Sequence, residues 1–225
     1  MCVRTMFLAA LLSVCGVAGA IAQISLATGK TAGSQFLLAG KNSGATLYYD
    51  DRDFEVVKRA AGFLSQDIGL VTGRNATVQA LPAAKETAIV VIGTLGHNSL
   101  IDRLVSEGRL NVDKIRGGWE QYAVEVVERP AAGIRKALVI AGSDRRGTAY
   151  GLLSLSEAIG VSPWYWWADV PVAQKDRLTL DVKSYRSKEP SVKYRGLFIN
   201  DEDFGLKPWA AKTFEPELGD IGPKT

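Results

Sequence analysis

Residues 136–160 have the sequence KALVIAGSDRRGTAYGLLSLSEAIG, and this stretch does most to decide the fold. Lys136–Ala141 is a short apolar run that predicts a buried strand, and Gly142–Asp144 predicts a tight turn after it. Arg146–Ile159 then predicts an amphipathic helix, with Gly160 at the position where a left-handed residue often ends helices. The apolar residues expected on this helix are Tyr150, Leu153, Leu155 and Ile159. A strand that turns directly into a helix is typical of folds that pack helices on a sheet.

A second helix of the same kind lies upstream. Ala45–Tyr49 predicts a strand, and we expect Asp50 or Asp51 to cap the helix that follows. The apolar face of that helix recurs at intervals of three and four residues, at Phe54, Val57, Ala61, Leu64 and Ile68. Gly73 is expected to end it.

The remaining elements complete one domain. Further strands are expected at Phe36–Leu38, Thr87–Ile92, Gln121–Val127 and Leu178–Val182, and a short helix at Ser99–Val105. Arg129-Pro130 is expected to begin the turn after the strand at 121–127. Together the elements predict an α/β (α+β) domain over residues 23–185. Its mixed β-sheet would carry helices largely on one face and would be closed by the strand at 178–182.

The sequence changes character after residue 185. Ser187–Pro190 is a charged linker, and Val192–Asn200 (VKYRGLFIN) predicts a new strand with the acidic end Asp201-Glu202-Asp203. A loop rich in Pro and Gly follows, and we expect no helix to cover that strand. Residues 186–225 therefore predict the start of a second domain. If the strand opens a (β/α) barrel, the acidic end lies at the barrel mouth, where such enzymes hold their active sites.

The N-terminal 22 residues predict a cleavable signal peptide, because a basic start and a 12-residue apolar run, Met6–Val17, precede small residues. The product would be secreted or periplasmic. Cleavage would remove Cys2 and Cys15, the only cysteines, so no disulfide or cysteine metal site is expected. The net charge of +3 is too small to predict a nucleic-acid or acidic-membrane partner.

Three segments could carry chemistry, and each has a structural alternative. His97 is the only histidine, so neither a zinc site nor a Ser-His-Asp triad is expected, and no metal or cofactor is predicted. The turn at 142–147 (GSDRRG) could present N–H groups to an anion, but a tight connection capped by Ser143 or Asp144 is favoured. The aromatic run at 164–167 (WYWW) is either a packing block between two domains or a surface that contacts sugars.

Several segments together resemble glycoside hydrolase family 115. They are residues 50–75, 91–96, 118–120, 141–151, 156–171 and 190–202. The resemblance implies an α/β domain followed by a TIM-type barrel, in an enzyme that removes glucuronic acid or its 4-O-methyl form from glucuronoxylan. Family members invert configuration, which needs an acid and a base roughly 6.5–9.5 Å apart. The resemblance puts the catalytic acid beyond residue 225.

By this resemblance Asn200, Asp201 and Glu202 would line the pocket for the uronic acid, with Asp201 the foremost substrate-binding residue. The 225-residue chain alone is expected to be inactive, and a homodimer is left open for the full-length protein. The alternative from a different class is that residues 23–185 form a non-catalytic carbohydrate-binding or interaction module. Trp166 and Trp167 motivate that alternative, because aromatic faces stack well on sugars.

Overall fold

The structure, a computed structural model, describes residues 24–27, 34–41, 43–80, 86–198, 206–213 and 216–218. The chain divides into two compact units, Met1–Glu189 and Pro190–Thr225, and each is described by itself. The predicted signal peptide, residues 1–22, lies outside the described residues. Within the described ranges, no helix has both the length and the apolar character that crossing a membrane requires.

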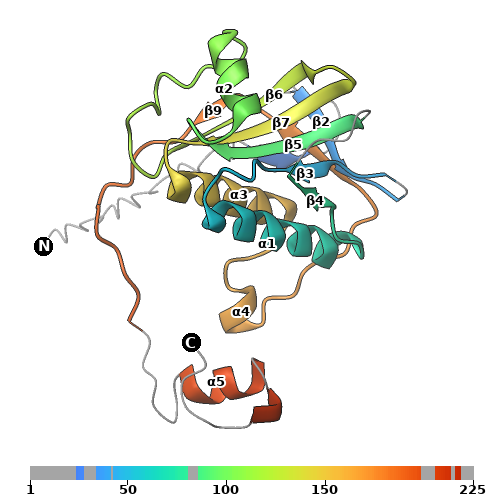
Figure 1. Ribbon diagram of the computed structural model, residues 1–225. Helices are drawn as coiled ribbons and strands as arrows, with labels where there is room; N and C mark the ends of the chain where they lie inside the picture. The colour runs from blue at the N-terminus through green and yellow to red at the C-terminus, as the bar shows by residue number, and fades with distance from the viewer. Residues whose placement is uncertain are drawn as a thin grey trace, which may run out of the picture. The chain divides into compact units, whose positions relative to one another are not determined.

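The first unit is built on a six-stranded mixed sheet with the order β4-β3-β5-β7-β6-β9 (Figure 1). The strands are β3 (Thr46–Tyr48), β4 (Val78–Gln79), β5 (Glu86–Thr94), β6 (Tyr122–Ala131), β7 (Ile134–Gly142) and β9 (Tyr185–Arg186). The four strands from β4 to β7 in this order run parallel, whereas β6 and β9 are antiparallel to their neighbours. Parallel neighbours need crossover connections, and α1 (Glu55–Thr72) and α2 (Ser99–Ser106) lie in these connections.

A smaller sheet contains the strand that was expected to close the large one. β8 (Leu178–Val182) pairs antiparallel with β1 (Ile24–Leu26) on one side and β2 (Ser34–Ala39) on the other. The prediction that 178–182 closes the main sheet is therefore wrong. Alternate residues of β8 are buried, so the strand has one apolar face, and that face packs into the core beside α3 (Arg145–Ile159).

Helices α1 and α3 cover one face of the large sheet, as the predicted apolar faces required (Figure 1). Gly73 ends α1 in the left-handed conformation at φ 77°, and Gly160 ends α3 in the same way at φ 109°. Neither Asp50 nor Asp51 caps α1, whose N-cap residue is Phe54 without a side-chain hydrogen bond. Their expected role was wrong because residues 50–53 form a turn before the helix begins.

The apolar face of α3 differs from the predicted one. Leu155 and Ile159 are buried as expected, but Tyr150 and Leu153 are exposed, Leu153 by 52%. Leu152 is buried in their place, together with small residues of the helix. Small residues let α3 approach β7 and β6 closely, so its buried stripe runs through Gly147 and Gly151 rather than through the largest side chains.

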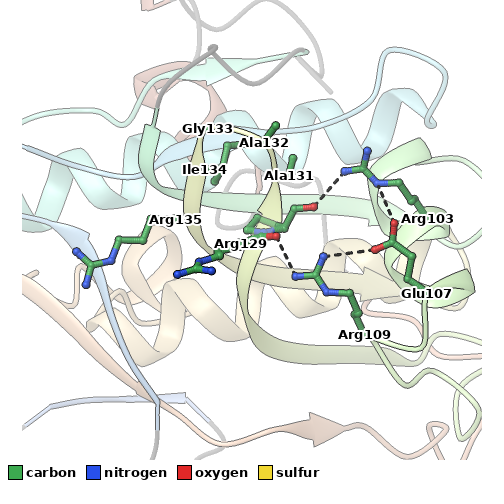
Figure 2. Close-up of a pocket in the computed structure, with 10 residues that line it drawn as sticks. Arg103, Glu107, Arg109, Arg129, Ala131, Ala132, Gly133, Ile134 and Arg135 are labelled. Carbon is green, nitrogen blue, oxygen red and sulfur yellow. Dashed lines mark hydrogen bonds and ion pairs between the residues drawn. The ribbon is translucent and has the colours of Figure 1, made fainter.

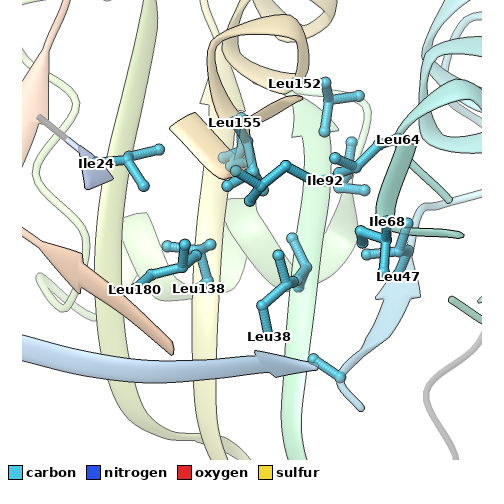
Figure 3. Close-up of a cluster of buried hydrophobic side chains, with 14 of the residues drawn as sticks. Ile24, Leu38, Leu47, Leu64, Ile68, Ile92, Leu138, Leu152, Leu155 and Leu180 are labelled. Atoms are coloured by element: carbon cyan, nitrogen blue, oxygen red, sulfur yellow. The ribbon is translucent and has the colours of Figure 1, made fainter. Parts of the chain in front are cut away.

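Two hydrophobic clusters lie on opposite faces of the large sheet. The larger cluster fills the space between the sheet, the two long helices and the small sheet (Figure 3), and includes Leu38, Leu64, Ile92, Leu138 and Leu180. The second lies under α2 and the following loop, and includes Ile89, Val91, Ile101, Leu104 and Ile115. Alternate residues of β5 point into different clusters, which explains its continuous apolar run. The predicted mixed α/β class is confirmed, with α2 on the face opposite α1 and α3.

The hairpin between β6 and β7 is longer than expected. β6 continues through Arg129 and Pro130 to Ala131, so the prediction that these two residues begin the turn is wrong. The pairing register shifts between Glu128 and Ala131, and Arg129 has φ 49°. Pro130 has no N–H to donate to the neighbouring strand, and the bulge accommodates it within β6. The turn forms at residues 132–133 instead.

In the second unit, the described part of the predicted strand Val192–Asn200 forms no regular structure. Tyr194, Leu197 and Phe198 are 87%, 80% and 90% exposed. A strand needs a hydrogen-bonding neighbour, and no described strand pairs with this segment. The expectation that only a loop follows was also wrong, because α5 (Leu206–Thr213) and a short 3₁₀ helix (Pro216–Leu218) come after this segment. Pro208 stands in the first turn of α5, where proline is tolerated.

Candidate functional site

The predicted site residues Asn200, Asp201 and Glu202 lie outside the described residues. The structure therefore neither brings them together nor separates them. What it does describe is a set of polar groups in the first unit. They lie at the carboxyl ends of the parallel strands, in the aromatic segment at 164–167, and in two basic hollows.

Asp50 follows β3 and links two β–α connections. Its carboxylate accepts hydrogen bonds from Arg52 Nε at 3.0 Å and Nη2 at 2.9 Å. It also accepts from the backbone N–H and the hydroxyl of Ser99, the first residue of α2, at 3.1 and 2.9 Å. The Arg52 guanidinium, aided by the Ser99 donors and opposed by burial, holds the pKa of Asp50 well below its usual range. Asp50 is thus an anion fixed at the start of α2 rather than a proton donor or acceptor.

Asp53 and Asp144 also accept hydrogen bonds from backbone N–H groups, at the ends of β5 and β7. Asp53 accepts from the backbone N–H of Thr94 at 2.7 Å, and Thr94 shares a buried 2.9 Å hydrogen bond with Thr148 of α3. Asp144 caps α3 by accepting from the N–H groups of Arg146 and Gly147, at 3.0 and 2.8 Å. The second oxygen of Asp144 accepts from the N–H of Glu120 at 2.7 Å, so this carboxylate is fully engaged.

The turn at 142–147 is therefore a tight connection and not an open anion cradle. Two N–H groups of the α3 N-terminus already have the Asp144 carboxylate as acceptor. A Cβ on Gly142 would lie 2.2 Å from the backbone nitrogen of Thr148, and one on Gly147 would lie 2.0 Å from the carbonyl oxygen of Gln121. The two glycines are needed because backbone segments meet there without space for a side chain.

The described side-chain contacts of His97 and of the aromatic segment at 164–167 are packing contacts. The His97 ring contacts Phe54, with ring centroids 4.4 Å apart. No group of three or more His, Cys, Asp or Glu that could hold a metal occurs in the part of the chain that the structure describes. In the segment at 164–167, Tyr165 packs at the edge of the larger core, whereas Trp164 is 63% exposed. The side chains of Trp166 and Trp167 lie outside the described set.

A basic hollow lies between the C-terminal part of α2 and the β6–β7 hairpin (Figure 2). It has a volume of about 620 Å³. We call it the arginine hollow, and its lining residues are Arg103, Glu107, Arg109, Arg129, Pro130, Ala131, Ala132, Gly133, Ile134 and Arg135. Four of these side chains are cationic and one is anionic, so this one hollow concentrates a formal charge of +3, as large as the net charge of the whole chain.

Two of the four guanidinium groups are fixed by the hairpin backbone. Arg103 Nη2 donates to the carbonyl oxygen of Pro130 at 3.0 Å, and Arg109 Nη2 donates to that of Arg129 at 2.9 Å. Glu107 forms ion pairs with both, at 3.8 Å to Arg103 and 3.3 Å to Arg109. The side chains of Arg129 and Arg135 are exposed and make no hydrogen bond or ion pair with any described residue, and no dashed line reaches either guanidinium group in Figure 2.

Sequence reasoning missed the arginine hollow. Its cationic residues come from a helix, the loop after it and both strands of a hairpin, and they share no motif. The near balance of acidic and basic residues in the whole chain also conceals a local excess. Only the packing of α2 against the second cluster brings these arginines to one place.

A second basic hollow, of about 730 Å³, lies near the end of the first unit. Its cationic residues include Lys114, Arg116, Arg186 and Lys188. Arg186 is occupied by Asn111 and Glu125, and Glu189 of the hollow accepts from the backbone of Trp119 at 3.2 Å. Of the four cations of this hollow, only the Arg186 side chain is held by contacts between described residues, whereas the arginine hollow has two such side chains, Arg103 and Arg109.

Comparison with known proteins identifies the class. The sequence model of glycosyl hydrolase family 115 matches residues 187–225. A solved family GH115 4-O-methyl-α-glucuronidase, described as specific for decorated arabinogalactans, is 34% identical with a TM-score of 0.59 over 77% of this chain and 21% of its own. These likenesses place the chain among the glycoside hydrolases. Within that class it belongs to glycosyl hydrolase family 115, and it spans about a fifth of the length of that solved relative.

A second solved structure is much less similar. The GH20 β-N-acetylhexosaminidase from Streptomyces coelicolor A3(2) is 11% identical, with a TM-score of 0.42 over 76% of this chain and 25% of its own. No curated protein matches the chain.

Proposed function

We propose that the chain is the N-terminal part of an exported glycoside hydrolase that releases glucuronic acid, or its 4-O-methyl form, from xylan. The observation that carries the proposal is the 34% identity to a 4-O-methyl-α-glucuronidase of the same family over 77% of this chain. The apolar N-terminal segment supports export, and the family match at 187–225 supports a catalytic domain that begins there.

The proposed reaction is inverting hydrolysis. One carboxylic acid would protonate the leaving oxygen while another carboxylate activates water on the opposite side of the sugar. We assign neither of these roles to the 225 residues. Asn200, Asp201 and Glu202 would instead bind the uronic acid at the mouth of the barrel. Because like charges repel, Asp201 and Glu202 would accept hydrogen bonds from sugar hydroxyls rather than face the substrate carboxylate.

The polymer that carries the uronic acid needs a direct test. The resemblance in the sequence favours xylan, whereas the solved relative is described as specific for decorated arabinogalactans. That relative is described as a 4-O-methyl-α-glucuronidase, so the proposed side group, an α-linked uronic acid, is compatible with either polymer. The domain around that bond would decide which backbone is accepted.

The test is to extend the gene past Thr225 and assay the longer product on glucuronoxylan and on glucuronic-acid-decorated arabinogalactan. We expect release of the uronic acid from at least one polymer, and no release by the 225-residue chain. Asp201→Asn in the longer product should raise KM by about tenfold or more, since a charged hydrogen bond is lost. The exposed Asp51→Asn change is the matched control and should leave KM unchanged. Absence of uronic acid release from both polymers would overturn the proposal.

A second candidate function is a carbohydrate-binding module without catalysis. The 63% exposure of Trp164, at the start of the aromatic segment, favours it. Titration of the chain with neutral xylo-oligosaccharides should then change its tryptophan fluorescence, and Trp164→Ala should abolish that change. A flat titration would remove this candidate.

A further inference from the structure

We propose that the arginine hollow binds carboxylate groups of acidic polysaccharide, so that the first unit holds uronate-decorated polymer directly. The proposal rests on the proposed function for its choice of anion, because that function supplies a polymer with uronic acid side groups. The cationic residues that line the hollow are Arg103, Arg109, Arg129 and Arg135.

The arrangement favours anion binding because part of its charge is already held in place. Arg103 and Arg109 donate to carbonyl oxygens of the hairpin and share Glu107, which fixes their guanidinium groups against α2. The side chains of Arg129 and Arg135 extend from the two strands of the same hairpin and have no described partner. A guanidinium matches a carboxylate with two parallel N–H donors, so these two side chains can each bind one carboxylate in a bidentate manner.

The backbone at Arg129 also helps to place its side chain. Arg129 has φ 49°, a left-handed conformation that arginine rarely adopts. Arg109 stabilises this conformation by donating to the carbonyl oxygens of both Glu128 and Arg129. One fixed arginine therefore holds the bulge from which a second, unpaired arginine projects.

The lining argues for a charged ligand over a neutral sugar. No aromatic side chain is among the lining residues, so the stacking surface that neutral sugars use is missing there. The remaining wall consists of small and aliphatic residues of the hairpin turn at 130–134. The volume of about 620 Å³ lies within the range of small-ligand sites, which is suitable for one or two substituted sugars rather than a long stripe of nucleic acid.

Calorimetry on the full 225-residue chain tests the proposal with defined probes. The acidic probe is a xylotriose that carries 4-O-methylglucuronic acid, the neutral probe is xylotriose, and inorganic sulfate tests for an unspecific anion site. We expect binding of the acidic probe only, weakened by added salt because the attraction is between charges. The double variant Arg129→Gln/Arg135→Gln should bind about tenfold more weakly or worse.

Two matched controls use arginines elsewhere in the first unit. Arg59→Gln removes an exposed arginine of α1, and Arg116→Gln removes one from the second basic hollow. Both should bind the acidic probe as the unmodified chain does. Circular dichroism and the Tm of the double variant should match those of the unmodified chain, because the side chains of Arg129 and Arg135 make no described contact.

Equal binding of xylotriose or sulfate, or full binding by the double variant, would overturn the proposal. So would loss of binding in Arg116→Gln alone, since that would move the site to the second hollow. This experiment measures binding by the 225-residue chain, whereas the proposed function is tested by hydrolysis with the longer product. The binding proposal and the proposed function can therefore be overturned independently of each other.

Discussion

The Asp50 carboxylate links two β–α connections, because it binds Arg52 before α1 and Ser99 at the start of α2. It is 8% exposed and receives four hydrogen bonds from the Arg52 side chain and from Ser99, with distances of 2.9–3.1 Å. The same carboxylate also accepts from the backbone of Arg52 at 3.1 Å. Because these donors favour the ionised form, the pKa of Asp50 lies below that of an unfolded aspartate, mainly through Arg52.

The sign of the pH effect follows from that lowered pKa. Asp50 contributes stability above the unfolded pKa of about 3.9, and this contribution is lost as the pH falls toward the folded value. We expect Asp50→Asn to lower the free energy of unfolding at pH 7 by about 1–3 kcal/mol, because the donors lose a charged acceptor. Urea unfolding at pH 7 and pH 3 measures it. The variant should lose less stability on acidification than the unmodified chain, and Asp51→Asn should behave like the unmodified chain.

Two helical glycines allow a matched test of backbone approach. Gly147 begins α3 against the carbonyl of Gln121, 2.0 Å from where a Cβ would stand, so Gly147→Ala forces the helix away from β6. We expect a loss of about 2–4 kcal/mol. Gly62 lies within α1 with no atom within 4 Å of its missing Cβ. Gly62→Ala should stabilise the fold by about 0.5–1 kcal/mol in the same thermal unfolding measurement. Similar effects at both positions would contradict the close approach.

At the scale of elements, α3 tests which face of a helix enters the core. Leu155 is fully buried, whereas Leu153 is 52% exposed two positions earlier. Leu155→Ala should therefore cost about 2–5 kcal/mol of unfolding free energy, and Leu153→Ala less than about 0.5 kcal/mol. Chemical denaturation of both variants measures the difference. Equal losses of unfolding free energy in the two variants would mean that Leu153 is buried as the sequence predicted.

The elements that sequence reasoning predicted are those whose signals are local. The apolar run of β5, the periodic face of α1 and the glycines that end both long helices are visible in single short segments. Two of the failures involve partners distant in the chain. Nothing within Leu178–Val182 says that it pairs with β1 and β2, and nothing near Asp50 says that its carboxylate reaches Ser99.

The two candidate sites also differ in whether their residues are adjacent in the sequence. A short acidic motif at 200–202 could be named from the sequence because its members are adjacent. The arginine hollow could not, since Arg103 and Arg135 are joined only by the docking of α2 on a hairpin. A bulge at Arg129 adds to the difficulty, because a left-handed arginine has no sequence signature.

At the scale of the whole molecule, the two units differ in what supports them. The first has a sheet buried on both faces, with apolar clusters above and below it. In the second, the segment at 190–198 has no regular structure and exposes large apolar side chains. Burial of such side chains is what offsets the conformational entropy of an ordered chain, so this segment is the less stable part.

Limited proteolysis with chymotrypsin should therefore cut this segment first. Tyr194, Leu197 and Phe198 are preferred by that protease for their side chains, and all three are at least 80% exposed. The expected first product ends between residues 194 and 198, because Phe36 and Tyr48 of the first unit are buried and its exposed Phe63 and Tyr150 lie within the helices α1 and α3. Mass spectrometry of the first stable product locates the cut.

Chymotrypsin cleavage at residues 194–198 also tests whether this segment is buried in a longer protein. A triple change of Tyr194, Leu197 and Phe198 to Ser should slow chymotrypsin at this place while trypsin still cuts at the neighbouring Lys193 or Arg195. If residues 192–200 form the first strand of a barrel in the product extended past Thr225, pairing and burial on both sides would protect them. Chymotrypsin should then spare these sites in the longer product and cut them in the 225-residue chain. Equally fast cleavage in both would remove the barrel strand from the proposed domain, whereas protection in both would mean that the segment is buried without it.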